Sequence, residues 1–242
     1  MFLTQEEGYY ALTKTGTISL CLLVALLVLF TLFSVKPDKE HAEAEKKSRI
    51  SVRQLVFSAA ALALAFVLSF IRLFSFPWGG SVTLCSMLFV TLIGYWYGPR
   101  VGLTAAFAYG LLEFVQDGGS YVLSPLQVGL DYLFAFTALG LSGFFRRNKN
   151  GLLIGYLAAI LVRGLMHTIG GYLYWMDYMP ENFPPHLAAL YPVIYNYAYI
   201  LGEGLITVIL ISIPAIRRAL KQTRILAVPA EDVSSVSKET KS

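Results

Sequence analysis

Hydrophobic residues fall into seven long runs that are separated by short polar stretches. A helix rises about 1.5 Å per residue, so roughly 20 apolar residues cross the hydrocarbon core of a bilayer. The pattern therefore predicts an all-α protein, a polytopic bundle of transmembrane helices. The predicted helices span residues 17–35, 52–72, 82–98, 100–117, 125–145, 151–176 and 191–216.

Composition supports a membrane environment. Of the 242 residues, 56% are hydrophobic and 14% are charged, whereas soluble domains carry about 25% charged residues. We expect the surplus apolar surface to face a lipid bilayer, and we expect no nucleic acid partner. Cys21 and Cys85 both lie in apolar runs without metal-binding spacing, so we interpret them as small apolar residues.

Basic residues are sorted to one side of the predicted bundle, which fixes its orientation. Alternate connections hold no Lys or Arg, namely 73–81, 118–124 and 177–190. Positive charge marks the cytoplasmic side of a membrane protein, so these three loops are predicted to be extracellular. The Lys and Arg residues between the helices fall instead in 36–53, 97–100, 145–151 and the tail after 216.

Three regions follow from this pattern. Residues 1–50 hold the first transmembrane helix and a charged linker, which is predicted to be cytoplasmic. Residues 51–220 form a membrane domain of six helices. Residues 221–242 are polar and rich in Ser, Glu and Lys towards their end, so we expect a disordered cytoplasmic tail.

Motifs of catalysis are absent from the sequence. It contains no G-x-x-x-x-G-K-[ST] loop, which would cradle the phosphates of ATP, and no H-E-x-x-H or cysteine cluster that would hold a metal. We therefore expect no enzyme activity, no metal and no cofactor.

Polar residues inside the predicted helices converge at one depth. Ionisable groups in a membrane are costly and indicate a function or a partner. Asp131 lies about 9 Å below the outer end of its helix, by the helical rise. His167 and Trp175, on the sixth run, and Tyr191 and Asn196, on the seventh, reach the same outer third. The outer loops add Trp78 and Tyr121.

These residues predict a pocket open to the outside that suits a small, flat, cationic heterocycle. Aromatic faces and a carboxylate attract a desolvated cation, and His and Asn edges discriminate among heteroaromatic bases. Simpler interpretations stay open, because aromatic residues also form interfacial belts and a buried Asp or His is often structural. Arg163 and Glu203 are expected to form a buried pair below the pocket, and Glu113 is either rim or structure.

Several segments resemble one transporter family. The runs from Pro77 to Leu84 and from Tyr97 to Leu103 are similar to the substrate-binding (S) components of energy-coupling factor vitamin transporters. Pro125-Leu126-Gln127, Leu130-Asp131-Tyr132, the spacing of Arg163, His167, Gly171 and Trp175, and Tyr195-Asn196 narrow the resemblance to thiamin-specific S components. It covers roughly residues 50–220.

The resemblance implies a six-helix S-component core, to which the helix at 17–35 is extra, with thiamin bound near the outer face. The residues matching the family's substrate site are Trp78, Tyr121, Asp131, Tyr132, His167, Trp175, Tyr191 and Asn196. Whether Asp131 neutralises the thiazolium charge or pairs with the aminopyrimidine edge stays open.

The resemblance also implies partners: a membrane coupling protein and two ATPase subunits. The family docks through small residues on the first core helix, where Ala59 and Ala63 have the required spacing and Ala61 and Ala65 repeat it. Ordinary helix packing explains such a pattern equally well. We thus expect high-affinity thiamin capture at a bacterial plasma membrane. The alternatives are a self-sufficient proton-coupled transporter, with Glu113, His167 or Glu203 as its relay, and a membrane enzyme or sensor.

Overall fold

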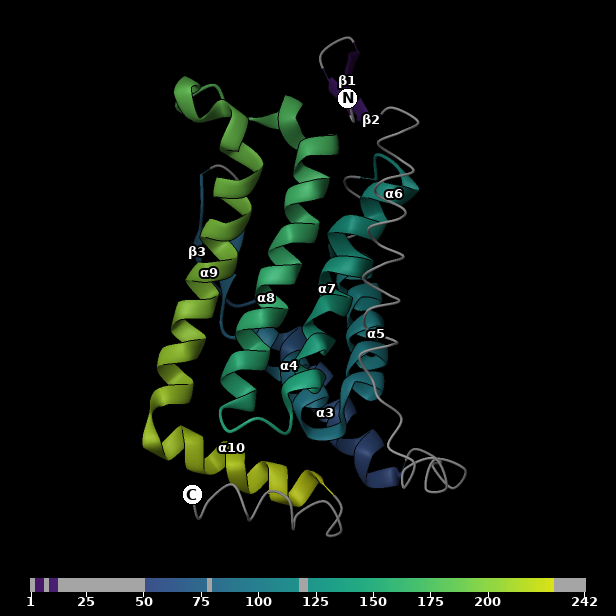
Figure 1. Cartoon of the computed structure of the whole chain (residues 1–242), viewed down its shortest axis with the longest axis vertical. Coiled ribbons are helices and arrows are strands. Elements are labelled where there is room, and N and C mark those ends of the chain that lie inside the picture. The colour runs from purple at the N-terminus through teal and green to yellow at the C-terminus, as the bar shows by residue number, and fades with distance from the viewer. Residues whose placement is uncertain (1–2, 7–8, 13–50, 78–79, 118–121, 229–242) are drawn as a thin grey trace.

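The structure, a computed structural model, describes residues 3–6, 9–12, 51–77, 80–117 and 122–228. The predicted helix at 17–35 and the linker up to residue 50 lie outside the described residues. Most of the remaining helices run side by side along the long axis of the bundle (Figure 1). The main helices are α3 (Val52–Ser69), α4 (Ser86–Tyr97), α5 (Pro99–Asp117), α8 (Gly151–Gly170) and α9 (Tyr191–Ser212).

Two of the predicted spans are continuous helices that change their winding. The span Pro125–Phe145 passes from α6 (Pro125–Val128) through a π-helical segment, η1 (Gly129–Phe134), to α7 (Ala135–Thr137) and the 3₁₀ helix η2 (Ala138–Phe145). The span Gly151–Tyr178 continues α8 through the π-helical η3 (Gly171–Trp175) and the short η4 (Met176–Tyr178). A 3₁₀ turn, η5 (Pro185–Leu190), precedes α9.

Four of these helices are long and apolar enough to span a membrane: Val52–Ser69, Pro125–Phe145, Gly151–Tyr178 and Pro185–Ser212. The shorter α4 is apolar as well, and α5 completes six helical segments for the membrane domain over the described part of the chain. The predicted all-α membrane bundle is therefore confirmed, with two small hairpins added.

The hairpins flank the bundle. Strands β1 (Leu3–Glu6) and β2 (Tyr9–Leu12) pair antiparallel, and the β2 backbone lies beside η3. Strands β3 (Arg72–Ser75) and β4 (Ser81–Thr83) pair with Arg72 opposite Thr83. The prediction of a helix over 82–98 is wrong at its start, because residues 81–83 pair as a strand and Cys85 turns the chain at φ 57° before α4 begins.

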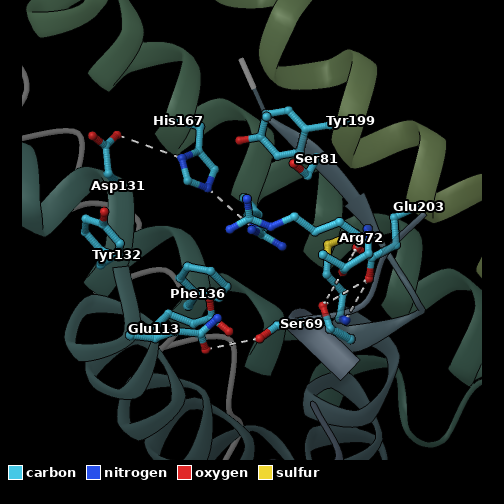
Figure 2. A pocket seen from close by; sticks show the side chains of 16 residues that line it. Ser69, Arg72, Ser81, Glu113, Asp131, Tyr132, Phe136, His167, Tyr199 and Glu203 are labelled. Atoms are coloured by element: carbon cyan, nitrogen blue, oxygen red, sulfur yellow. Dashed lines mark hydrogen bonds and ion pairs between the residues drawn. The ribbon is translucent and has the colours of Figure 1, made fainter. Parts of the chain in front are cut away.

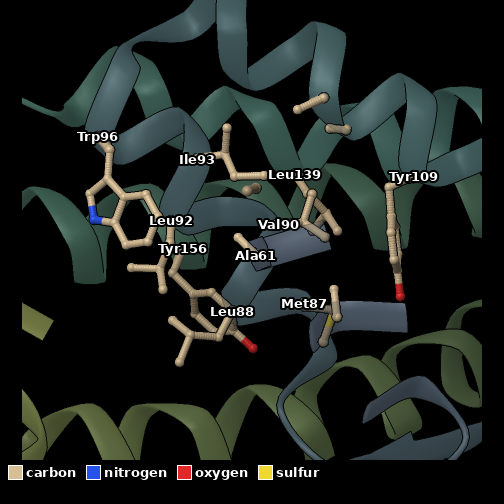
Figure 3. Packing of buried hydrophobic residues seen from close by; sticks show 14 of the residues in the cluster. Ala61, Met87, Leu88, Val90, Leu92, Ile93, Trp96, Tyr109, Leu139 and Tyr156 are labelled. Carbon is tan, nitrogen blue, oxygen red and sulfur yellow. The ribbon is translucent and has the colours of Figure 1, made fainter. Parts of the chain in front are cut away.

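The hydrophobic core lies where α4, α5, η2 and α8 meet (Figure 3). Gly94, Gly102 and Gly140 bring three backbones together, since a Cβ on Gly140 would stand 2.5 Å from the Gly102 carbonyl carbon. Around this contact pack large side chains that are almost fully buried, among them Ile93 and Tyr156. The core fills one half of the bundle, and polar residues of the other half surround a cavity.

The last predicted helix, 191–216, is two helices. Helix α9 ends at Ser212, and α10 (Pro214–Ala227) turns across the foot of the bundle (Figure 1). Proline cannot continue a helix, and it keeps the preceding Ile213 extended. Residues 221–227 are thus helical, which corrects the expected start of the disordered tail at 221; residues 229–242 lie outside the described residues.

The predicted cytoplasmic connections meet at this foot. Tyr97 donates its hydroxyl to the Ala227 carbonyl at 3.2 Å, and Arg224 Nη2 donates to the Arg146 carbonyl at 3.0 Å. Because these bonds join the 97–100 turn, the loop after η2 and α10, the structure places three of the basic segments at one end. This arrangement fits the orientation predicted from their charge.

Candidate functional site

A carboxylate on η1 forms the centre of the polar site. Asp131 Oδ2 accepts hydrogen bonds from Gln127 Nε2 and from Trp175 Nε1, each at 2.8 Å. His167 Nδ1 lies 3.8 Å from the other oxygen, Oδ1. Both the Asp131 and the His167 side chains are mostly buried, at 13% and 12% exposure. The structure thus brings together four side chains that the sequence places on two different helices.

Local sequence explains how the carboxylate is held. Ser124 caps the helix by accepting from the Gln127 backbone N–H at 3.1 Å, and Pro125 occupies the first turn, where no N–H is needed. Gln127 then lies one turn before Asp131, at the i, i+4 spacing that lets an amide reach a carboxylate. Gly170 leaves the space opposite, because a Cβ there would stand 2.5 Å from Asp131 Oδ1.

Asn196 joins α9 to this group. Its side chain is 1% exposed, and Nδ2 donates to the His167 carbonyl at 3.2 Å and to the Pro192 carbonyl at 2.8 Å. Its Oδ1 accepts from the Tyr199 hydroxyl at 3.0 Å. The amide is therefore satisfied at both ends, and it fixes the backbone that carries His167.

A column of tyrosines on α9 connects the outer end of the helix to the site. Tyr191 stacks on Tyr195, with ring centroids 4.9 Å apart and an interplanar angle of 28°. Tyr195 lies 6.5 Å from Tyr199, whose ring meets the His167 ring edge-on at 6.2 Å. Tyr191 is therefore connected to His167 through the other two rings.

A cavity of about 350 Å³ opens beside Asp131 (Figure 2), within the usual range for small-molecule sites. Asp131, Tyr132 and His167 line one end of it. The charged groups along its described wall are three carboxylates and two guanidinium groups, so the formal charge of these residues, with neutral His167, is one negative. They belong to Glu113, Asp131, Glu203, Arg72 and Arg163.

Arg163 faces the cavity instead of forming the expected buried pair. Its Nε donates to His167 Nε2 at 3.4 Å, and its guanidinium carbon lies 4.2 Å above the centre of the Phe136 ring. No ion pair between Arg163 and Glu203 is found among the described residues, so that prediction is wrong. Because His167 Nε2 accepts from Arg163, the proton of the neutral ring is on Nδ1, facing Asp131.

Glu203 holds the corner between β4 and α4. Its Oε2 accepts from the Thr83 backbone N–H at 3.3 Å and from the Thr83 hydroxyl. Its Oε1 accepts from the Met87 backbone N–H at 3.0 Å and from the Ser86 hydroxyl at 3.3 Å. These donors satisfy the buried carboxylate in place of the arginine that we expected.

The other predicted site residues divide into two groups. Trp175 and Asn196 contact the Asp131–His167 group directly, and Tyr191 connects to it through Tyr195 and Tyr199, but none of the three lines the cavity. Trp78 and Tyr121 lie outside the described residues. Sequence reasoning missed Gln127 and Tyr199. Gln127 lies one helical turn before Asp131 and Tyr199 one turn after Asn196, and this spacing could have indicated both residues.

Apolar helices around a charged, ligand-sized cavity define a multi-pass membrane protein with a small-molecule binding site. Among the described residues, no group of three His, Cys, Asp or Glu side chains is placed to hold a metal. The described lining of the cavity offers hydrogen-bonding groups, aromatic faces and charged side chains.

Comparison with known proteins identifies the family. The chain matches the family model described as Thiamine transporter protein (Thia_YuaJ) over residues 55–223, and it belongs to this family. It is 27% identical over 180 residues to the thiamine transporter ThiT of Bacillus subtilis strain 168, covering 69% of this chain and 91% of that protein. A second ThiT, from Lacticaseibacillus paracasei, is 28% identical over 124 residues, or 45% of this chain and 60% of that protein.

A solved structure shares the fold. The structure of ThiT from Listeria monocytogenes matches with a TM-score of 0.56 and 27% identity, covering 73% of this chain and 97% of that one. The family and this structural match establish the chain as a bacterial multi-pass membrane protein of the thiamine transporter family.

Proposed function

We propose that the chain captures thiamin from the extracellular side, as the substrate-binding subunit of an ATP-driven energy-coupling factor importer. The observation that carries this proposal is the Asp131 carboxylate, held by Gln127 and Trp175 beside a cavity whose formal charge is one negative. A monocationic heterocycle balances that charge. Family membership supplies thiamin as the substrate.

The geometry suggests how Asp131 meets the ligand. Oδ2 already accepts two hydrogen bonds, whereas Oδ1 makes only the longer 3.8 Å approach to His167 among the described residues. Oδ1 is therefore the oxygen that faces the ligand, either a thiazolium ring or the edge of an aminopyrimidine. Tyr132 lines the same cavity and offers an aromatic face, which contributes about 1–2 kcal/mol to a desolvated cation, whereas the Phe136 ring already carries the Arg163 guanidinium.

The remaining predicted contacts support the site in two ways. Trp175, Tyr191 and Asn196 hold Asp131 and His167 in place, directly or through neighbouring rings. We retain Trp78 and Tyr121 as ligand contacts on the basis of the sequence alone. Because buried polar groups penalise any analogue that leaves them unpaired, this arrangement favours a heterocycle with both a charge and hydrogen-bonding edges.

Docking to the coupling protein is assigned to α3. Ala59 and Ala63 are exposed, whereas Ala61 and Ala65 are 3% and 0% exposed inside the bundle. Only the first pair is therefore accessible to another helix, and small side chains allow a close approach in lipid. The chain would deliver thiamin through the coupling protein and two ATPases, which supply the energy.

Calorimetry tests the binding step. The purified full-length chain should bind thiamin without ATP, and Trp175→Phe should weaken binding about tenfold or more, because a hydrogen bond to a carboxylate is lost. Tyr172→Phe is the matched control, since Tyr172 also lies on η3 but donates to the Ala189 carbonyl. The proposal fails if thiamin does not bind, or if both variants bind as the unaltered chain does.

Reconstitution separates the proposal from its rivals. Proteoliposomes that contain the chain alone should not accumulate thiamin, and adding the coupling protein, both ATPases and ATP should start uptake. Uptake by the chain alone that stops with a protonophore would instead establish a proton-coupled transporter. Conversion of bound ligand to a product would establish an enzyme.

A further inference from the structure

A second cavity lies at the basic foot of the bundle, away from the site of Asp131. It measures about 250 Å³ and is enclosed by α4, the start of α8, the end of α9 and α10. Four basic side chains line it and no Asp or Glu does; they are Lys149, Arg217, Lys221 and Arg224. The cavity therefore combines strong positive charge with a concave, partly open shape.

Three of the four cations have no acidic partner among the described residues. Lys149, Arg217 and Lys221 are exposed, and none forms an ion pair within the described part of the chain. The stretches 132–176 and 204–228, which build most of the walls, contain no Asp or Glu at all. A ligand with negative charge would neutralise these exposed cations.

Arg224 is a buried cation of the cavity wall whose position is fixed by its contacts. It is 7% exposed, its guanidinium carbon lies 4.2 Å above the Tyr95 ring, and Nη1 donates to the Tyr95 hydroxyl at 2.6 Å. Nη2 donates to the Arg146 carbonyl. These contacts hold one cation in a fixed position while the three exposed ones surround the opening.

Part of the cavity wall is apolar. Leu92, Ile211 and Leu220 line the same cavity, and α10 lies across the end of the bundle where the predicted cytoplasmic connections gather (Figure 1). In the orientation predicted from the charges, this end of the bundle lies at the cytoplasmic head groups. Basic pockets between helices at that level suit anionic lipid head groups.

We propose that this cavity binds a phosphate group, supplied by an anionic phospholipid that seats its head group among Lys149, Arg217 and Lys221 and its glycerol end against the apolar wall. A soluble phosphate offers the same charge but nothing to occupy the apolar side. The bound lipid would hold α10 flat against the membrane surface. This site is independent of thiamin binding.

Native mass spectrometry of the full chain, taken from nanodiscs of phosphatidylglycerol and phosphatidylcholine, tests the proposal. Phosphatidylglycerol should be retained in preference to phosphatidylcholine. Arg217→Gln should reduce the retention of phosphatidylglycerol about fivefold, because one basic residue contributes about that factor to the affinity for an anionic lipid. Lys221→Gln combined with it should reduce retention roughly 25-fold. Arg218→Gln, next in sequence but outside the cavity lining, should retain the lipid.

Inorganic phosphate provides the second arm. Three results together would show that the site binds a soluble phosphate rather than a lipid. Phosphate would stabilise the detergent-purified chain against heat, Arg217→Gln would abolish that stabilisation, and phosphatidylglycerol would not be retained. Equal losses from Arg217→Gln and Arg218→Gln would show only general attraction to a basic surface and would overturn the proposal. So would the absence of any preference for either anion.

Discussion

Replacing Glu203 with Gln tests whether α9 holds the β3–β4 hairpin in place. Glu203 is 3% exposed, and each of its oxygens accepts from one backbone N–H, that of Thr83 or of Met87. A glutamine has one acceptor oxygen and one NH₂ group. Whichever way it is turned, its NH₂ faces a backbone donor that cannot reverse.

The magnitude follows from that conflict. One buried N–H left without an acceptor costs roughly 1–3 kcal/mol, and the remaining bonds lose the strengthening that a charged acceptor gives. We therefore expect Glu203→Gln to lower the free energy of unfolding by about 2–4 kcal/mol. For a chain of this size, that loss lowers the midpoint of thermal unfolding by about 5–10 °C.

Thermal unfolding in detergent, followed by tryptophan fluorescence, measures the effect. Glu181→Gln makes the same chemical change at an exposed position and should shift the midpoint by no more than about 2 °C. If both variants melt together, the hydrogen bonds at the β4–α4 corner do not stabilise the fold and the reasoning is wrong.

Two further predictions concern the site and the docking face. Gly170→Ala should raise the dissociation constant for thiamin about tenfold, because the new Cβ would stand only 2.5 Å from Asp131 Oδ1 and would push that oxygen away. An unchanged affinity by calorimetry would contradict this geometry. Ala63→Leu should leave thiamin binding intact and abolish uptake by the reconstituted transporter, because Ala63 is exposed on α3. Normal uptake with this variant would remove Ala63 from the proposed interface.

The membrane helices were predictable because hydrocarbon imposes a simple rule. A run such as 125–145 must satisfy its own backbone groups in lipid, and only a helix does so within one segment. The structure accordingly has a continuous helix over Pro125–Phe145. Two features were missed for different reasons. The corner at Thr83 depends on a tertiary contact with Glu203, whereas the start of α10 follows from Pro214, a local signal that the hydrophobic pattern concealed.

The candidate site was predictable in its members and less so in their partners. Depth along each helix placed Asp131, His167 and Asn196 together, and the structure joins them through Asp131–His167 and Asn196–His167 contacts. Depth says nothing about direction around a helix axis. Arg163 and Glu203 therefore were expected to pair, although Arg163 turns towards Phe136.

Direction around the axis explains why Trp175 meets Asp131 at all. Along an α-helix, each step of four residues advances about 40° beyond a full turn, so the face that joins Arg163, His167 and Trp175 should drift away from its neighbour. The structure replaces the last such turn with η3 (Gly171–Trp175), a π-helical segment whose wider turn needs more residues to close and so offsets the drift. Asp131 lies in the other π-helical segment, η1. Both partners of the 2.8 Å Trp175–Asp131 bond thus depend on a helical distortion that periodicity in the sequence does not reveal, and such distortions are frequent at functional sites.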